Sequence, residues 1–122
     1  MRFIFLILSG LVLVACGDNG VAERSPAEIA EIATTAATLR PTDPRLLDVY
    51  ERSCANCHAI VESGAPLTGD VAGWDPRLRK GDDVLLESTI NGFEGMPPMG
   101  LCPDCTAAEF RELIRFMSTA GD

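Results

Sequence analysis

The sequence predicts a small all-α domain with long loops. Two capping boxes, Ser25 with Glu28 and Thr106 with Glu109, mark the starts of helices. Apolar residues after Asp43 recur at helical intervals of three and four, whereas no alternating strand pattern and no internal repeat stands out. A length of 122 residues allows one domain.

Residues 1–15 have the pattern of a signal peptide. Arg2 precedes an apolar run that is too short for a comfortable transmembrane span. The run ends in LVAC, which resembles the bacterial lipobox, so cleavage before Cys16 would leave that cysteine as a lipid-bearing N-terminus. An uncleaved helix ending at Cys16 is the alternative, but polar residues follow at once. We therefore expect a lipoprotein on the periplasmic face of a bacterial membrane, and Gly17-Asp18 favours the outer membrane by resemblance to lipoprotein sorting.

The mature chain is expected to be acidic. The formal net charge is −8, and loss of residues 1–15 removes only Arg2, which leaves −9. This charge argues against nucleic acid as a partner and suits docking to basic proteins. Export also implies an oxidising compartment, where thiols tend to form disulfides.

Residues 16–42 are predicted to be a lipid-anchored tether and a spacer helix. The helix begins with its cap Ser25, has Pro26 at its first position and extends to about Leu39, before Pro41. Its apolar stripe is weak, which favours a spacer or a loosely docked helix over a core element.

The folded domain is predicted to span residues 43–122. Asp43 caps a helix from Pro44 to about Ser53, and a loop rich in Gly and Pro from 63 to 76 is expected to contain no regular element. Asp82 is expected to cap a third helix that ends at Asn91-Gly92. An irregular segment then leads to the last helix, residues 107–118, which has a continuous apolar face.

This domain is short of apolar core. Residues 43–122 contain only five aromatic side chains, namely Tyr50, Trp74, Phe93, Phe110 and Phe116. A domain of this size buries too little surface to be stable without a staple, a metal or a cofactor. A large flat apolar cofactor would supply the missing core and let the long loops pack on it.

The stretch CANCH, residues 54–58, is the most specific motif in the chain. The spacing Cys-x-x-Cys-His is that of covalent haem c attachment. Cys54 and Cys57 would add across the haem vinyl groups as thioethers. His58, the only histidine, would then be held beneath the iron as an axial ligand.

Two other sites use similar spacing. Zinc could be bound by Cys54, Cys57, Cys102 and Cys105, because paired Cys-x-x-Cys units are a usual zinc arrangement. That interpretation conflicts with export and gives His58 no role. A thioredoxin-like redox pair needs a βαβ context, and none is visible in the sequence. Haem is therefore the favoured cofactor.

The second axial ligand must be a residue other than histidine. Methionine is the natural candidate, because a Met/His pair raises the reduction potential and closes the iron to other ligands. Met96 is followed by Pro97 and Pro98, which stiffen the loop that delivers its sulfur. Met99 is the rival, and its other possible role is apolar cover for the haem edge.

These residues together resemble the class I cytochrome c family and its monohaem c5-like branch. The resemblance covers about Asp43 to Met117 and rests on CANCHA, GAPLTGD, Trp74 with Arg77, GFEGMPPMGLCPDC and the closing helix. It implies α-helices wrapped around one covalently bound haem, with the first and last helices crossing. It also implies His58 as proximal ligand and Met96 as distal ligand.

The resemblance assigns further roles. Pro66 matches the family proline whose carbonyl accepts the other imidazole N–H, a bond that orients a ligating histidine. Cys102 and Cys105 match a surface disulfide beside the methionine loop. Trp74 and Arg77 are expected near a haem propionate, or as core packing and surface charge. Met99 stands where the family often has lysine, which makes the exposed haem edge less basic.

The predicted function is therefore one-electron transfer by a membrane-tethered carrier in a respiratory-type chain. No nucleophile, acid–base pair or open coordination site is evident, so we expect an electron carrier and not an enzyme. Its expected partners are membrane-bound oxidoreductases. Three alternatives remain open: a haem-bearing subunit of a larger membrane oxidoreductase, a haem-based gas sensor if Met96 leaves the iron, and a zinc-binding module.

Overall fold

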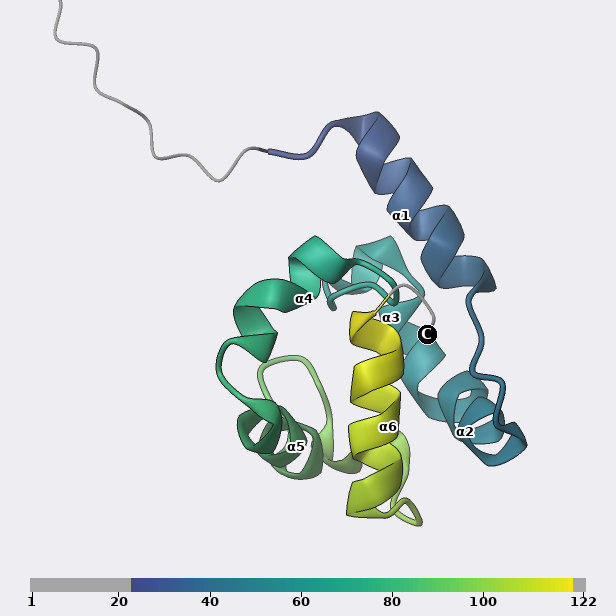
Figure 1. Ribbon diagram of the computed structural model, residues 1–122, viewed down its shortest axis with the longest axis vertical. Coiled ribbons are helices and arrows are strands. Elements are labelled where there is room, and N and C mark those ends of the chain that lie inside the picture. The colour runs from purple at the N-terminus through teal and green to yellow at the C-terminus, as the bar shows by residue number, and fades with distance from the viewer. Residues whose placement is uncertain (1–22, 120–122) are drawn as a thin grey trace, which may run out of the picture.

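A computed structural model describes residues 23–119, and their regular secondary structure consists of helices joined by loops (Figure 1). The signal peptide and Cys16 lie outside the described residues. Within residues 23–119 no strand is formed, as the all-α prediction required, and none of the helices is long and apolar enough to span a bilayer. The helices are α1 Pro26–Thr38, α2 Pro44–Val49, α3 Ala55–His58, α4 Val71–Leu78, α5 Asp82–Asn91 and α6 Ala107–Ser118, with a π-helical turn η1 Tyr50–Cys54 and 3-10 turns η2 Val61–Ser63 and η3 Pro98–Leu101.

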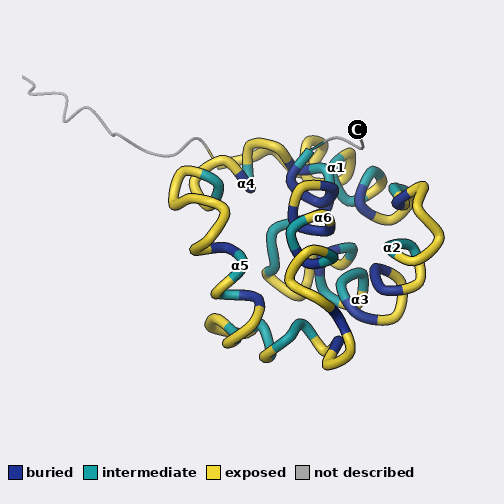
Figure 2. The backbone as a smooth tube through the Cα atoms, turned by 60° about the horizontal axis from the view of Figure 1, so that its bottom comes forward, coloured by how far each residue is buried: buried dark blue, intermediate teal, exposed yellow. Residues whose placement is uncertain are grey.

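The last helix, α6, is the centre of the domain. It runs between α4 and α5 on one side and α2 on the other (Figure 1), and one whole face of it is buried (Figure 2). The capping box of Thr106 and Glu109 is present as predicted. The first helical segment packs on α6 through Tyr50, whose ring meets that of Phe116 edge-on at 5.2 Å. The two helices that the family resemblance pairs therefore contact each other.

The predicted first helix of the domain is longer than expected. Asp43 caps α2 by accepting hydrogen bonds from the Arg45 and Leu46 amides. The helix then passes through η1, where the Ala55 amide donates to the Tyr50 carbonyl, and continues to His58. The entire CANCH motif thus lies at the C-terminal end of one continuous helical segment.

Two predictions about the middle of the domain were wrong. The segment 63–76 was expected to be irregular, but α4 begins inside it at Val71 and continues through Pro76. Asp70 caps α4 by accepting from the Gly73 amide, and the burial of Trp74 outweighs the poor helix propensity of Gly and Pro. Asp82 is the first residue of α5 and not its cap; Gly81 occupies the cap position.

Helix α1 has the predicted capping box at Ser25 and Glu28, and it is only partly docked. Residues 23–31 are exposed, whereas Ala36 is completely buried and Leu39 packs against the core cluster. The N-terminal half of the helix is therefore exposed, and its C-terminal half packs against the domain.

Candidate functional site

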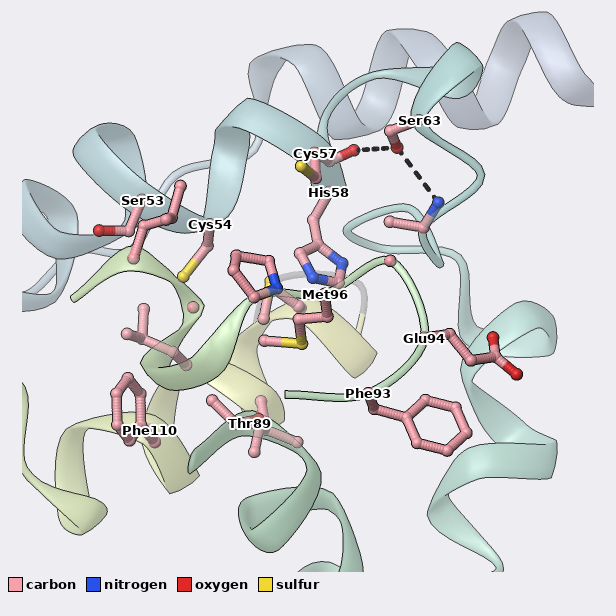
Figure 3. A pocket seen from close by; sticks show the side chains of 18 of the residues that line it. Ser53, Cys54, Cys57, His58, Ser63, Thr89, Phe93, Glu94, Met96 and Phe110 are labelled. Atoms are coloured by element: carbon pink, nitrogen blue, oxygen red, sulfur yellow. Dashed lines mark hydrogen bonds between the residues drawn. The ribbon is translucent and has the colours of Figure 1, made fainter. Parts of the chain in front are cut away.

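Two adjoining cavities of about 280 and 390 Å³ open between the CANCH segment, α5, α6 and the methionine loop. Figure 3 shows the first cavity, with the His58 imidazole and Met96 on its walls. The residues that line both cavities are His58, Thr89, Phe93, Glu94, Met96, Ile114 and Met117. His58 and Met96 therefore lie where the two cavities join.

His58 is buried and held by the loop that follows the motif. Its Nδ1 lies 2.8 Å from the Pro66 carbonyl oxygen, and its own carbonyl accepts from the Thr68 amide at 2.8 Å. The Trp74 ring stacks against the imidazole at a centroid distance of 5.6 Å. With Nδ1–H donating to Pro66, the second ring nitrogen carries the free lone pair.

The protonation state of His58 suits a metal ligand. Burial lowers its pKa, the Pro66 carbonyl opposes that shift, and the charge of Arg77 adds to it. The imidazole is therefore neutral at pH 7, as coordination requires.

Cys54 and Cys57 line the first cavity beside His58 and are not bonded to each other. Burial raises the pKa of Cys54 to about 11, so this thiol is protonated at neutral pH. A catalytic dithiol needs a lowered thiol pKa, so the environment of Cys54 argues against a thioredoxin-like redox pair. The Ser63 hydroxyl donates to the Cys57 carbonyl at 2.7 Å and accepts from the Ala65 amide, which ties the next loop to the motif (Figure 3).

Met96 lies at the end of a tight turn. The Phe93 amide donates to the Met96 carbonyl at 3.1 Å, and the Met96 amide donates to the Phe93 carbonyl at 2.9 Å. Gly92 lies directly behind this turn, and a Cβ there would meet the Met96 carbonyl oxygen at 2.9 Å and the Pro98 nitrogen at 3.0 Å. A Cβ on Gly100 would lie 3.4 Å from the Met96 methyl group. Close backbone contacts thus fix the loop.

Met99 is directed elsewhere. It is absent from the lining of both cavities and packs against the core cluster. Its φ of 58° turns the chain in η3. Of the two methionines in this loop, Met96 faces His58 across the cavity and Met99 does not.

The second cysteine pair lies at the end of the same loop. Cys102 and Cys105 are joined as a disulfide with a Cα separation of 5.4 Å, and the Cys102 amide donates to the Met99 carbonyl at 2.9 Å. Both cysteines are buried in the core cluster, so the bond is not at the surface as the resemblance implied. Arg52, two residues before Cys54, donates to Asp104 at 2.9 Å. The disulfide turn is thereby linked to the CANCH helix.

The cysteines do not assemble into the alternative zinc site. Over residues 23–119, the one cluster of three possible metal ligands comprises Cys102, Asp104 and Cys105, with no atom from Cys54 or Cys57. Two of its three members are bonded to each other, and Arg52 brings a positive charge to the third. This arrangement does not favour a divalent cation.

Trp74 and Arg77 both line the second cavity. Trp74 is also a core residue, with its indole N–H donating to the Leu67 carbonyl at 2.9 Å. Arg77 donates to the Gly73 carbonyl at 2.7 Å and lies with Lys80 at the rim. Trp74 is therefore a core residue, as one of its two predicted roles required, and it also lies on the cavity wall; its place near a haem propionate stays a prediction.

Sequence reasoning missed the buried support of this site. Tyr50 donates its hydroxyl to Thr68 at 2.9 Å, and both residues are completely buried. Thr68 lies in the stretch GAPLTGD, but nothing in the sequence indicated its hydrogen bond with Tyr50, because that contact joins segments distant in the chain. Gly92 had a signal, since Asn91-Gly92 was recognised as a helix end, but its closeness to Met96 was not foreseen.

The residues present fit a covalently bound haem. A mostly apolar cavity has two unbonded thiols on its wall, a neutral imidazole with a free lone pair, and a thioether from the opposite loop. This donor set matches His/Met axial ligation with two thioether attachments.

Comparison with known proteins agrees with this geometry. The sequence model of the family described as "Cytochrome C oxidase, cbb3-type, subunit III" matches residues 42–117. Cytochrome c5 of Ectopseudomonas mendocina is 41% identical over 73 residues, which are 58% of this chain and 84% of that protein. Cytochrome c-555 of Chlorobaculum thiosulfatiphilum is 38% identical over 72 residues, which are 56% and 84% of the two chains.

A solved structure is similar as well. It is described as "Crystal structure of electron transfer complex of nitrite reductase with cytochrome c", and one of its chains is 34% identical, with a TM-score of 0.55 over 66% of this chain and 98% of that one. Family, relatives and fold agree with the cavity and its ligands. The chain belongs to the cytochrome c family as a monohaem class I cytochrome c, an electron carrier with one covalently attached haem c.

Proposed function

We propose that this protein is a membrane-tethered carrier that passes one electron at a time in a bacterial respiratory-type chain. The observation that supports the proposal best is the opposition of His58 and Met96 across a cavity whose wall also carries two unbonded thiols. Cys54 and Cys57 would attach the haem, and His58 and Met96 would be its axial ligands. When bound, haem supplies a one-electron Fe(III)/Fe(II) couple.

The protein's own residues prepare the site for this task. The Pro66 carbonyl holds the imidazole in one tautomer and orientation. Met96 would fill the remaining axial position, which keeps other ligands away and favours electron transfer over gas binding. Ile114 and Met117 on α6 line both cavities and reduce the access of water. A rigid, apolar site limits the rearrangement between the two oxidation states.

The cellular setting is also part of the proposal. The signal-peptide pattern and Cys16 support export and a lipid anchor on the periplasmic face, with the outer membrane favoured. The same compartment would keep Cys102 and Cys105 oxidised. The similar chain in a complex with nitrite reductase supports a redox enzyme as partner, and we propose a membrane-bound oxidoreductase.

The test is a redox titration of the full chain produced with c-type haem maturation. A pyridine haemochrome of the c type and a one-electron Nernst curve are expected. Protein without covalent haem would contradict the proposal. Zinc bound in its place would support the alternative zinc site with four cysteine ligands. Membrane fractionation of the wild type and Cys16→Ala tests the anchor separately, since only the wild type should stay with the membrane.

A second candidate function is that of a fixed subunit of a membrane oxidoreductase. The matched family is itself described as a subunit of an oxidase, which favours this candidate over the gas sensor. Purification in mild detergent distinguishes the fixed subunit from the mobile carrier. A subunit co-purifies with its oxidoreductase at constant stoichiometry, whereas a mobile carrier is recovered alone.

A further inference from the structure

Arg24 and helix α1 lie before the region that matches the family, yet they contact the loop that holds His58. Arg24 Nη1 is 2.5 Å from Asp70 Oδ2, and the Asp70 side chain is only 8% exposed. Near the other end of α1, the Thr35 methyl group lies 3.0 Å from the place that a Cβ on Gly69 would occupy. Arg24, just before α1, and Thr35 within it therefore contact the adjacent residues Asp70 and Gly69.

The segment 66–70 is the main support of His58. Its Pro66 carbonyl lies 2.8 Å from the imidazole Nδ1, and its Thr68 amide donates to the His58 carbonyl. The Gly69 amide donates to the Met117 carbonyl on α6 at 2.8 Å. A contact that fixes residues 69 and 70 from outside therefore also restrains the atoms that orient the imidazole.

Asp70 provides a second connection to the same ring. Its carboxylate caps α4 at the Gly73 amide, and its carbonyl accepts from the Trp74 amide at 3.0 Å. Trp74 stacks on His58. The Arg24 guanidinium thus binds the residue that begins the helix carrying this stacking partner.

We propose that α1 is a positioning element for the proximal side of the haem site, attached at its start by Arg24 and near its end by Thr35 and the buried Ala36 beside it. Arg24 contacts Asp70 and Thr35 contacts Gly69, so these attachments act on the segment 66–70, and neither Arg24 nor Ala36 lines either cavity. The inference rests on the proposed role of His58 as axial ligand. It makes residues 24–39 part of the electron-transfer domain and not merely a spacer before it.

The expected consequence concerns the reduction potential. Burial and hydrogen bonding around an axial histidine tune the potential of the iron. If α1 is released, water gains access to the proximal side and favours the more highly charged oxidised form. Detaching α1 should therefore lower the potential without removing the haem or its axial ligands.

The test compares Arg24→Gln and Ala36→Glu with Ala37→Glu in the full haem-loaded chain. Ala36 is completely buried and Ala37 is exposed, so the two glutamates differ in their contact with the domain and not in residue type. The readouts are the potential and the hydrogen exchange of the Thr68 and Gly69 amides. Arg24→Gln and Ala36→Glu should lower the potential and make these two amides exchange roughly two- to tenfold faster.

The control and a conservative variant complete the design. Ala37→Glu should match the wild type in both readouts, and Arg24→Lys should restore most of what Arg24→Gln loses. Unchanged potential and exchange in both test variants, with a normal haem spectrum, would refute the positioning role alone. Absence of covalent haem from the wild type would refute the proposed function instead, so the two failures are distinguishable.

Discussion

The two sides of the cavity are held in different ways. On the proximal side, His58 is fixed by contacts between segments distant in sequence: the loop 66–70, the Trp74 ring on α4, and α6 through Gly69. On the distal side, Met96 is held by a turn whose hydrogen bonds join residues 93 and 96. Further along the same loop, hydrogen bonds again join residues three positions apart.

This difference predicts how each side responds to change. Several elements hold His58 on the proximal side, so loss of one contact should leave this ligand in place. The position of Met96 depends on the backbone geometry of its loop, so one added side-chain atom in that loop can displace it. Rigid elements generally hold a site more firmly than loops do.

Substitution of Gly92 should give the largest effect. Gly92 has φ 83° and ψ 154°, a region almost restricted to glycine, and a Cβ would meet the Met96 carbonyl oxygen and the Pro98 nitrogen. Gly92→Ala should destabilise the haem protein by about 3 kcal/mol and weaken Met96 ligation. Chemical denaturation measures the loss of stability. The weak sulfur-to-iron absorption band of the oxidised protein measures whether Met96 still binds the iron.

Gly81→Ala is the matched control. Gly81 has φ 99° and ψ 151°, close to the angles of Gly92, but a Cβ there would meet nothing within 4 Å and Gly81 lines neither cavity. It should cost about 1 to 2 kcal/mol and leave the sulfur-to-iron band unchanged. Equal effects from the two alanines would mean that backbone strain alone explains Gly92.

Removal of the disulfide is the next largest change. Cys102 and Cys105 close a very short loop, for which chain entropy predicts a loss of about 2 kcal/mol in the Cys102→Ser, Cys105→Ser double variant. Thermal denaturation of the haem protein measures it. Because the Cys102 amide binds the Met99 carbonyl, we also expect faster hydrogen exchange at residues 99–102 and not at 66–70. Equal loosening of both segments would contradict the separation of the two sides.

Tyr50→Phe probes the proximal side with a smaller change. It removes the hydroxyl that donates to Thr68 and leaves the edge-on contact with Phe116 intact. The free energy of unfolding should fall by about 1 kcal/mol, with His/Met ligation retained. Loss of an axial ligand in this variant would show that the proximal restraint is not shared as the structure implies.

The smallest effect concerns acid stability. The Thr106 amide, then Arg45 and the Thr106 hydroxyl, lower the pKa of Glu109 from 4.5 to about 2. A carboxylate with a lowered folded-state pKa stabilises the protein above about pH 4.5, and the contribution is lost as pH falls towards 2. Glu109→Gln should therefore reduce the pH dependence of stability in this window. Glu112→Gln, an exposed change on the same helix, is the control and should leave the profile as it is.

The sequence predicted what depends on local signals. The capping boxes at Ser25 and Thr106 begin helices where expected, and the apolar face of α6 is buried. The CANCH motif indicated a haem site because its spacing alone carries the chemistry. Helix α4 was missed, since Gly73 and Pro76 disfavour a helix locally and the burial of Trp74 is a property of the folded state.

The contacts that support the ligands could not be predicted from local pattern. The pairing of Tyr50 with Thr68 and of Arg24 with Asp70 joins residues far apart in the chain. The sequence favoured Met96 over its rival Met99, but the contacts that separate them belong to the fold: Met96 lines the cavity and Met99 packs on the core.

The central claim is that His58 and Met96 face each other as axial ligands, with Met96 positioned by the backbone of its own loop. The most direct measurement is the weak sulfur-to-iron absorption band of the oxidised protein, with carbon monoxide added to the reduced form, in Met96→Ala and Met99→Ala. We predict that Met96→Ala loses the band and binds carbon monoxide, while Met99→Ala keeps the band and does not. A band that survives Met96→Ala, or is lost in Met99→Ala alone, would contradict the claim.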